Sequence, residues 1–171
     1  MRGDLSHDKY DLARIIVRPL YFGMFANILI PGVLAFLCYW LNQNSPRPNN
    51  LGDSANTVFY LIGLISIVQA LVAIWMRQRL LGRPLVHSEK TFEDDLTANL
   101  KRGLIPIMII IALIAFYGGV YYFLTGRFEA SLIIMLFSFV AFQVIRPRLR
   151  SARTLVERQE KMLARGQTFS D

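Results

Sequence analysis

Four long stretches of apolar residues, separated by polar and charged connections, dominate the pattern of this 171-residue chain. A helix needs about 20 apolar residues to cross roughly 30 Å of hydrocarbon, where it satisfies its own backbone hydrogen bonds. The pattern predicts an all-α integral membrane protein, with four transmembrane helices as two antiparallel hairpins in a single domain, residues 1–171. The stretches, none of which contains Asp, Glu, Lys or Arg, cover about residues 20–41, 57–76, 104–124 and 130–145.

Two amphipathic helices are predicted outside these spans, over about residues 91–103 and 148–165. The first opens with Thr91 as an expected N-cap, and three acids follow in the first turn, where the helix dipole favours negative charge. The second places its apolar residues on one face and ends at Gly166. We expect both helices on the cytoplasmic side, with the first leading into the third span.

The orientation follows from the distribution of Lys and Arg. Seventeen of the 19 lie in the N-terminal segment, the second connection and the C-terminal tail, whereas the first and third connections hold one each, Arg47 and Arg127. The positive-inside rule then places both termini and the second connection in the cytoplasm. Aromatic pairs such as Tyr121 and Tyr122 fall at the predicted outer boundary, a depth that rings with one polar edge prefer.

Small residues predict how the spans pack, because lipid is as apolar as leucine and close backbone approach is what favours association. We expect one face of the second span to meet one face of the third. Pro31 is expected to kink the first span, because proline cannot donate a backbone hydrogen bond. The two faces consist of Gly63, Ser66, Ala70 and Ala73 in the second span, and Ala112, Ala115 and Gly119 in the third.

Asn27, Gln69 and Gln143 are the polar groups expected deepest in the membrane. An unpaired amide in hydrocarbon costs several kcal/mol, on the order of 2–7. Each amide should therefore face another helix and find a hydrogen-bond partner there. The alternative is that they contact a solute.

The chain lacks the residue patterns of an enzyme, and we predict no catalytic residue, no metal and no cofactor. The two histidines form no zinc-binding pair, and the single Cys38 excludes an intrachain disulfide. His87 and the nearby acids between residues 89 and 95 could in principle hold a divalent ion, but consecutive acids at a helix start are typical dipole-stabilising charges. Because no span contains a charge, proton-coupled translocation is disfavoured.

The layout resembles that of small four-helix inner-membrane proteins of bacteria. The resemblance rests on a third span opening after a basic segment, on the YYFLTG turn, and on a fourth span ending in IRPR. It implies the bacterial inner membrane as the location. The last two spans also resemble the hairpin of rotor-ring subunits, but the mid-membrane carboxylate of those proteins has no counterpart here.

These features lead to three functional hypotheses. The first is a non-enzymatic accessory, structural or assembly subunit of a membrane complex, with the bilayer and other membrane proteins or further copies as partners, and no nucleic acid. The second is an oligomeric channel or transporter for a neutral or anionic solute, lined by the three deep amides. The third is a regulator that binds anionic lipid through a basic cluster, which could instead dock a partner. That cluster comprises Arg146, Arg148, Arg150 and Arg153.

Overall fold

The computed structural model describes residues 10, 11, 15, 21–146 and 149–169, and within these the regular structure is entirely helical. The four apolar stretches form helices that are long and apolar enough to cross a membrane, as the sequence predicts. The second helix extends beyond its predicted span at both ends, the first extends beyond its own span at its end, and the third begins 12 residues earlier than predicted, whereas the other boundaries agree within two residues. The elements are η1 (Phe25–Leu29), α2 (Ile30–Asn44), α3 (Ser54–Leu81), α4 (Phe92–Thr125), α5 (Phe128–Ile145) and α6 (Leu149–Ala164).

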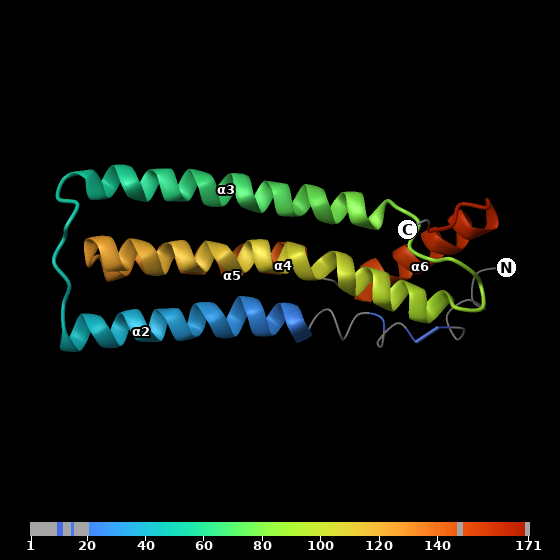
Figure 1. The fold of residues 1–171 in the computed structure, drawn as a ribbon, viewed down its shortest axis with the longest axis horizontal. Coiled ribbons are helices and arrows are strands. Elements are labelled where there is room, and N and C mark those ends of the chain that lie inside the picture. The colour runs from blue at the N-terminus through green and yellow to red at the C-terminus, as the bar shows by residue number, and fades with distance from the viewer. Residues whose placement is uncertain (1–9, 12–14, 16–20, 147–148, 170–171) are drawn as a thin grey trace.

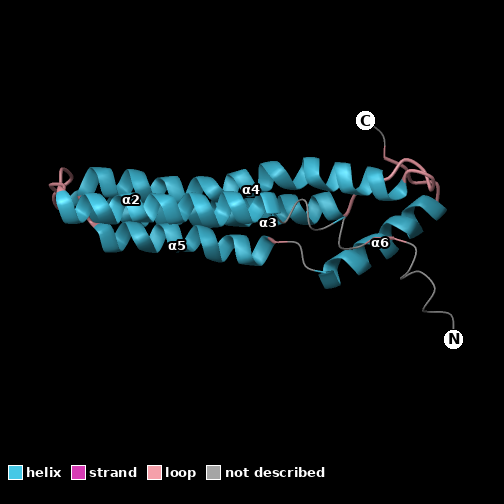
Figure 2. Cartoon of the chain, turned by 90° about the horizontal axis from the view of Figure 1, so that it is seen from below, coloured by secondary structure: helices cyan, strands magenta, loops and turns pink. Residues whose placement is uncertain are grey.

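Helix α4 is the centre of the molecule (Figure 1). Helices α2 and α3 lie on either side of it, and α5 packs against one face of this layer (Figure 2). Half of the apolar window of α4 is buried, against 22% for the first spanning helix and 17% for α3. Because α4 separates α2 from α3, the predicted first hairpin is not a directly packed pair. The two-hairpin arrangement is therefore not confirmed in full.

The predicted helix at 91–103 and the third span form one continuous helix. At about 1.5 Å per residue, the 34 residues of α4 extend over roughly 51 Å, well beyond the roughly 30 Å of hydrocarbon. Pro106 lies inside this helix without ending it. The first part of α4 therefore projects beyond the spans, toward the end of the molecule where α6 lies (Figure 1).

Pro31 has a visible effect on the first span. The turn directly before it, η1, is π-helical, and Pro31 is the second residue of α2. Proline has no N–H to donate to the carbonyl four residues earlier, and its ring crowds that carbonyl. That carbonyl belongs to Asn27, so the widened turn accommodates the ring at the position of the deep amide.

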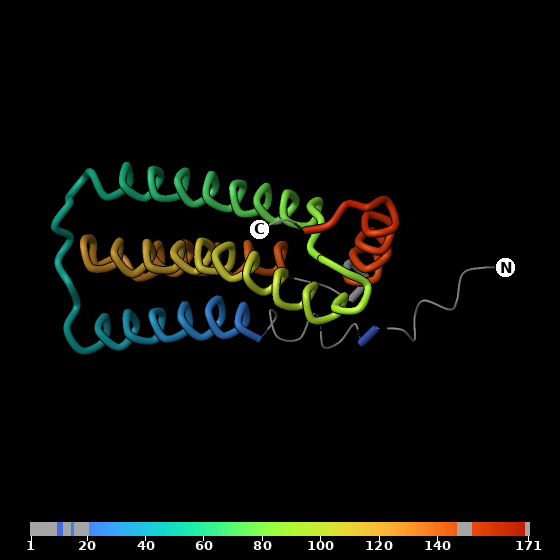
Figure 3. Tube along the Cα trace, turned by 45° about the vertical axis from the view of Figure 1, so that its right-hand side comes forward, coloured from blue at the N-terminus to red at the C-terminus, as the bar shows by residue number. Residues whose placement is uncertain are grey.

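Helix α6 and the connection between α3 and α4 form a compact cap at one end of the molecule. We use the name cap for residues 82–91 together with 149–169 (Figure 3). The side chain of Gln159, only 1% exposed, links the two parts: its Oε1 accepts the Leu85 N–H at 2.8 Å, and its Nε2 donates to the Arg83 carbonyl at 2.8 Å. After Gly166 the chain turns back, and the Phe169 N–H donates to the Val86 carbonyl.

Replacing Gln159 with leucine is expected to open the cap while the spanning helices stay intact. A buried backbone group left without its partner costs about 1–3 kcal/mol. This substitution removes the partner of the buried Leu85 N–H and that of the partly buried Arg83 carbonyl. Hydrogen exchange at the Leu85 amide should therefore accelerate strongly in the variant. The exposed neighbour Glu157, changed to leucine, is the matched control. Equal exchange rates in the two variants would contradict the role assigned to Gln159.

Candidate functional site

Three neighbouring helices donate side-chain hydrogen bonds to backbone carbonyls on one stretch of α4. The Asn27 Nδ2 donates to the Met108 carbonyl at 3.3 Å, the Gln69 Nε2 to that of Ile110 at 2.5 Å, and the Ser138 Oγ to that of Ile111 at 2.9 Å. These donors come from η1, α3 and α5, respectively. The stretch is the polar junction of the four apolar helices.

Only the nitrogen of the Asn27 side-chain amide forms hydrogen bonds to described residues. Its Nδ2 also donates to the Gly23 carbonyl at 3.0 Å, but its Oδ1 accepts no hydrogen bond from any described residue, although Asn27 is fully buried. Asn27 also lines an apolar groove of about 170 Å³ between the first span and α5. The other residues of this groove, called the α2–α5 groove below, are Ile28, Pro31, Gly32, Ala35, Leu132, Met135, Leu136 and Phe139.

The three deep amides do not gather at one place. Residues 108 and 110 point about 200° apart around a helix, so Asn27 and Gln69 approach α4 from opposite sides. Gln143 is half-buried on α5, and no hydrogen bond of its side chain to a described residue is seen. Asn27 and Gln69 thus have the interhelical partners expected of them, whereas Gln143 has none in the described part.

Ser138 did not stand out in the sequence, although it is fully buried and takes part in the junction. A hydroxyl on an apolar helix is a weak signal, because serine can equally bond to a carbonyl of its own helix. Interhelical hydrogen bonds of this kind contribute about 0.6 kcal/mol on average in membranes. Gln159 had a stronger signal: it occupies the face of α6 that also carries the buried Ala152, Leu155 and Val156.

The small residues of α3 and α4 are mostly buried, but they do not all face each other. Ser66, Ala70 and Ala73 on α3 and Ala112 and Ala115 on α4 are buried, whereas Gly63 is half-buried, with open space beside it.

The prediction for Gly119 needs correction. The side-chain position of Gly119 lies 3.8 Å from the Leu34 Cδ2 of α2, not against α3. The reason is that α4 has neighbours on several sides, so a small-residue row on a central helix does not identify the helix it meets. Gly118 makes the tighter contact: a methyl group there would lie 2.8 Å from the Ser131 carbonyl oxygen of α5.

Tyr121 and Tyr122 also differ from expectation, because both rings are fully buried and neither faces the membrane boundary. The Tyr121 hydroxyl donates to the Ala55 carbonyl of α3 at 3.3 Å, and its ring packs edge-on against Phe59. Their position near the end of a span indicated a membrane belt, but the central place of α4 turns these side chains inward.

The basic cluster after the fourth span is only partly described. Arg146 follows the last residue of α5 as its C-cap, and both Arg146 and Arg153 are exposed. Arg148 lies outside the described residues, and the side chain of Arg150 is not described. The exposed pair is compatible with either a lipid or a protein contact.

Asp95, in the acidic first turn of α4, links this helix by hydrogen bonds to the connection that precedes it. Among the described residues, no group of three or more His, Cys, Asp or Glu side chains could hold a metal ion. Thr91 precedes the helix as predicted, but its side chain makes no capping bond to a backbone N–H; its hydroxyl instead donates to the Asp95 Oδ2 at 2.7 Å. The same oxygen accepts the His87 N–H at 3.0 Å.

These contacts predict a pH dependence of the cap. Burial alone would raise the pKa of Asp95, but the Thr91 and His87 hydrogen bonds and the charge of His87 lower it, so that the pKa lies below its usual value. The stabilisation is therefore complete above about pH 4, the unfolded value, and is lost as the pH falls through the folded pKa.

Near neutrality Asp95 stays ionised, so its protonation does not affect hydrogen exchange at the His87 amide. In acid, as Asp95 becomes protonated, the protection of this amide relative to the intrinsic exchange rate at the same pH should fall. Asp95→Ala should lose that response, and Asp53→Ala, at the other end of the molecule, should keep it. An acid response unchanged in Asp95→Ala would contradict the assignment.

Comparison with known proteins yields no relatives: no family model, no curated protein and no solved structure matches this chain.

Proposed function

We propose that this chain is a non-enzymatic membrane protein that works by association, as an accessory or assembly subunit of a larger complex in the bacterial inner membrane. The observation that carries the proposal is the α2–α5 groove, which is lined by Asn27, a residue whose buried amide oxygen has no hydrogen-bond partner among the described residues. Hydrocarbon supplies no donor for such an oxygen. A hydroxyl or amide on a transmembrane helix of another subunit would supply one.

The surface around the groove suits a helix contact. Gly32 borders it, and a methyl group on Gly32 would meet no described atom outside its own helix backbone within 4 Å, so that the backbone is open to close approach. Small residues at a membrane-facing surface favour helix association because backbones can come together there. The low burial of α2 and α3 leaves most of their surfaces for lipid or for other subunits.

The proposed threading places the cap and both termini in the cytoplasm. The cap and residues 45–53 lie at opposite ends of the molecule (Figure 1). The chain termini, the connection at the cap end and the adjoining parts of α3 and α4 carry nearly all of the Lys and Arg, and this charge asymmetry supports the orientation.

Filling the groove tests the proposal. The wild-type protein, purified in mild detergent, is expected to elute with a membrane-protein partner, and Gly32→Leu should release that partner without changing the thermal stability of the chain. Gly63→Leu is the matched control, because Gly63 also has open space beside it but lies on α3. A wild-type protein that elutes alone as a monomer, or a Gly32→Leu variant that keeps its partner, would contradict the proposal.

A pathway lined by the three amides is the less favoured alternative. Asn27 and Gln69 use their donors on α4 carbonyls and lie on opposite sides of that helix. One copy of the chain therefore offers no common channel for the two, and the association proposal is preferred.

A further inference from the structure

A second groove runs between α3 and α4, close to the cap. Its volume is about 330 Å³, and it lies where the apolar part of α3 gives way to arginines. The floor is apolar: a methyl group on Gly103 would lie 2.6 Å from the Leu80 Cδ2, so the missing side chain of Gly103 leaves the space that Leu80 fills. The lining residues are Trp75, Met76, Arg79, Leu80, Arg83, Gly103, Pro106 and Ile107.

Two uncompensated positive charges border this α3–α4 groove. Arg79 and Arg83 are exposed, and in the described part of the chain neither forms an ion pair with a carboxylate. No acidic residue is among the described residues that line the groove. The guanidinium of Arg79 lies 5.2 Å from the ring centre of Trp75, a cation–π contact that holds the charge beside the ring.

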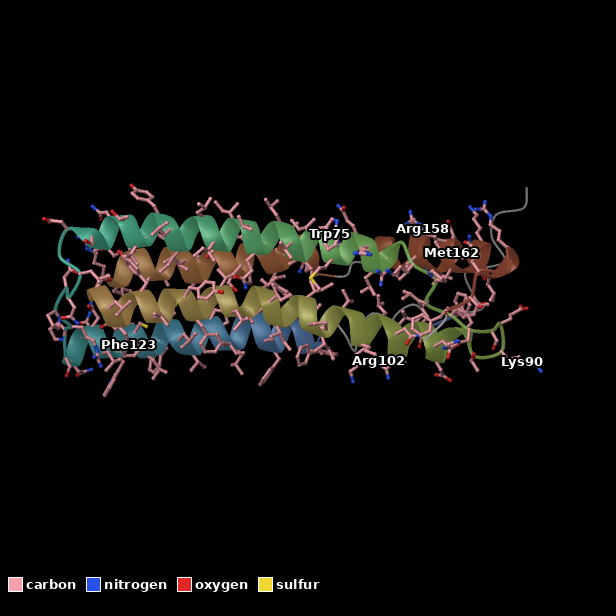
Figure 4. The ribbon with its side chains drawn as sticks, turned by 45° about the horizontal axis from the view of Figure 1, so that its top comes forward. Trp75, Lys90, Arg102, Phe123, Arg158 and Met162 are labelled. Carbon is pink, nitrogen blue, oxygen red and sulfur yellow. The ribbon has the colours of Figure 1, made fainter. Side chains whose placement is uncertain are left out.

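Trp75 indicates the depth of the groove. Its side chain is 56% exposed, and it precedes the first arginine after the second span, Arg77, by two residues. Tryptophan is enriched at the level of lipid headgroups, where one side of the ring is apolar and the other is wet. Figure 4 shows Trp75 on α3 at the side of the molecule away from Arg102.

We propose that the α3–α4 groove binds one anionic phospholipid. The phosphate lies between Arg79 and Arg83, and an acyl chain follows the apolar floor along Leu80 and Ile107. Basic pockets between transmembrane helices at the cytoplasmic surface suit this chemistry. A soluble phosphate would satisfy the arginines but leave the apolar floor unused, which favours a lipid. The site differs from the basic cluster that follows α5.

The two tryptophans of the chain provide the test, because Trp40 lies near the other end of the molecule. In the full-length Trp40→Phe variant, Trp75 is the only tryptophan. Reconstituted into phosphatidylcholine vesicles, its fluorescence should be quenched by brominated phosphatidylglycerol at a much lower mole fraction than by brominated phosphatidylcholine. The quenching should saturate.

The arginines should account for the preference. One basic residue near an anionic surface contributes about a 5-fold gain, so R79Q/R83Q should weaken the apparent affinity for phosphatidylglycerol roughly 25-fold. The matched control is K101Q/R102Q, which removes the same charge from exposed residues of α4 that do not line the groove. This control should change the affinity little.

Three results would overturn the proposal. Equal quenching by the two brominated lipids would show that no anionic site exists beside Trp75. Equal weakening by the two double variants would show a general surface-charge effect. Relief of quenching by millimolar inorganic phosphate would show a phosphate site that does not require the lipid. None of these results depends on a protein partner, so the test is separate from that of the proposed function.

Discussion

Replacing Gly118 with alanine is expected to destabilise the packing of α4 against α5 by about 1–3 kcal/mol, and leucine at this position should prevent stable folding. The added methyl group would lie 2.7 Å from the Met135 Cγ and 2.8 Å from the Ser131 carbonyl oxygen. The second contact is with backbone, which cannot move aside as a flexible side chain can. The two helices must separate along part of their length, and unfolding in detergent followed by circular dichroism measures the loss.

Gly63→Ala is the matched control for Gly118. It makes the same substitution in a spanning helix, but no described atom outside the backbone of that helix lies within 4 Å of the added methyl group. Alanine is the better helix former by about 1 kcal/mol, so this variant should be as stable as the wild type or slightly more stable. A Gly118→Ala protein that matches Gly63→Ala would show that α4 and α5 are not as close as described.

Gly126→Ala should be the second severe substitution, with an expected loss of about 2–5 kcal/mol. Gly126 follows α4 with φ +67°, a left-handed conformation that costs an L-residue roughly 1–2 kcal/mol. In addition, the added methyl group would collide with the backbone carbonyl of Arg47. That carbonyl belongs to the connection between α2 and α3, which the Asn50 N–H also ties to the Leu124 carbonyl at 3.2 Å.

Gly52→Ala separates the two causes. Gly52 has φ +52° but no atom within 4 Å of its side-chain position, so its replacement bears only the conformational cost. Thermal unfolding should rank the wild type first, Gly52→Ala second and Gly126→Ala last. If the two alanine variants are equally stable, the contact between Gly126 and Arg47 does not contribute.

The existence of the four apolar helices could be predicted because it depends on local properties. Each stretch is long enough for hydrocarbon and free of charge, and its helical backbone needs no partner elsewhere in the chain. Proline and glycine also act locally, which is why the distortion at Pro31 and the end of α6 before Gly166 could be anticipated.

The arrangement around α4 could not be predicted in the same way. Which helix Gly119 faces, and whether Tyr122 points to lipid or inward, depends on the number of neighbours around α4, and no local pattern encodes that number. The burial of Gln159 depends on a loop 74 residues earlier in the chain. Its place on the apolar face of α6 was the one available signal, but the loop that it holds could not be identified from the sequence.

The central claim is that four spans thread the membrane with the cap on the cytoplasmic side. Cysteine accessibility tests this claim most directly. In a Cys38→Ala background, single cysteines at Asp53, Lys90 and Gln167 report on the loop between α2 and α3 and on the two parts of the cap, all at exposed positions. A membrane-impermeant maleimide should label Asp53→Cys in intact cells, and Lys90→Cys and Gln167→Cys only after the membrane is opened. Labelling of the two cap cysteines in intact cells, with Asp53→Cys protected, would contradict the threading.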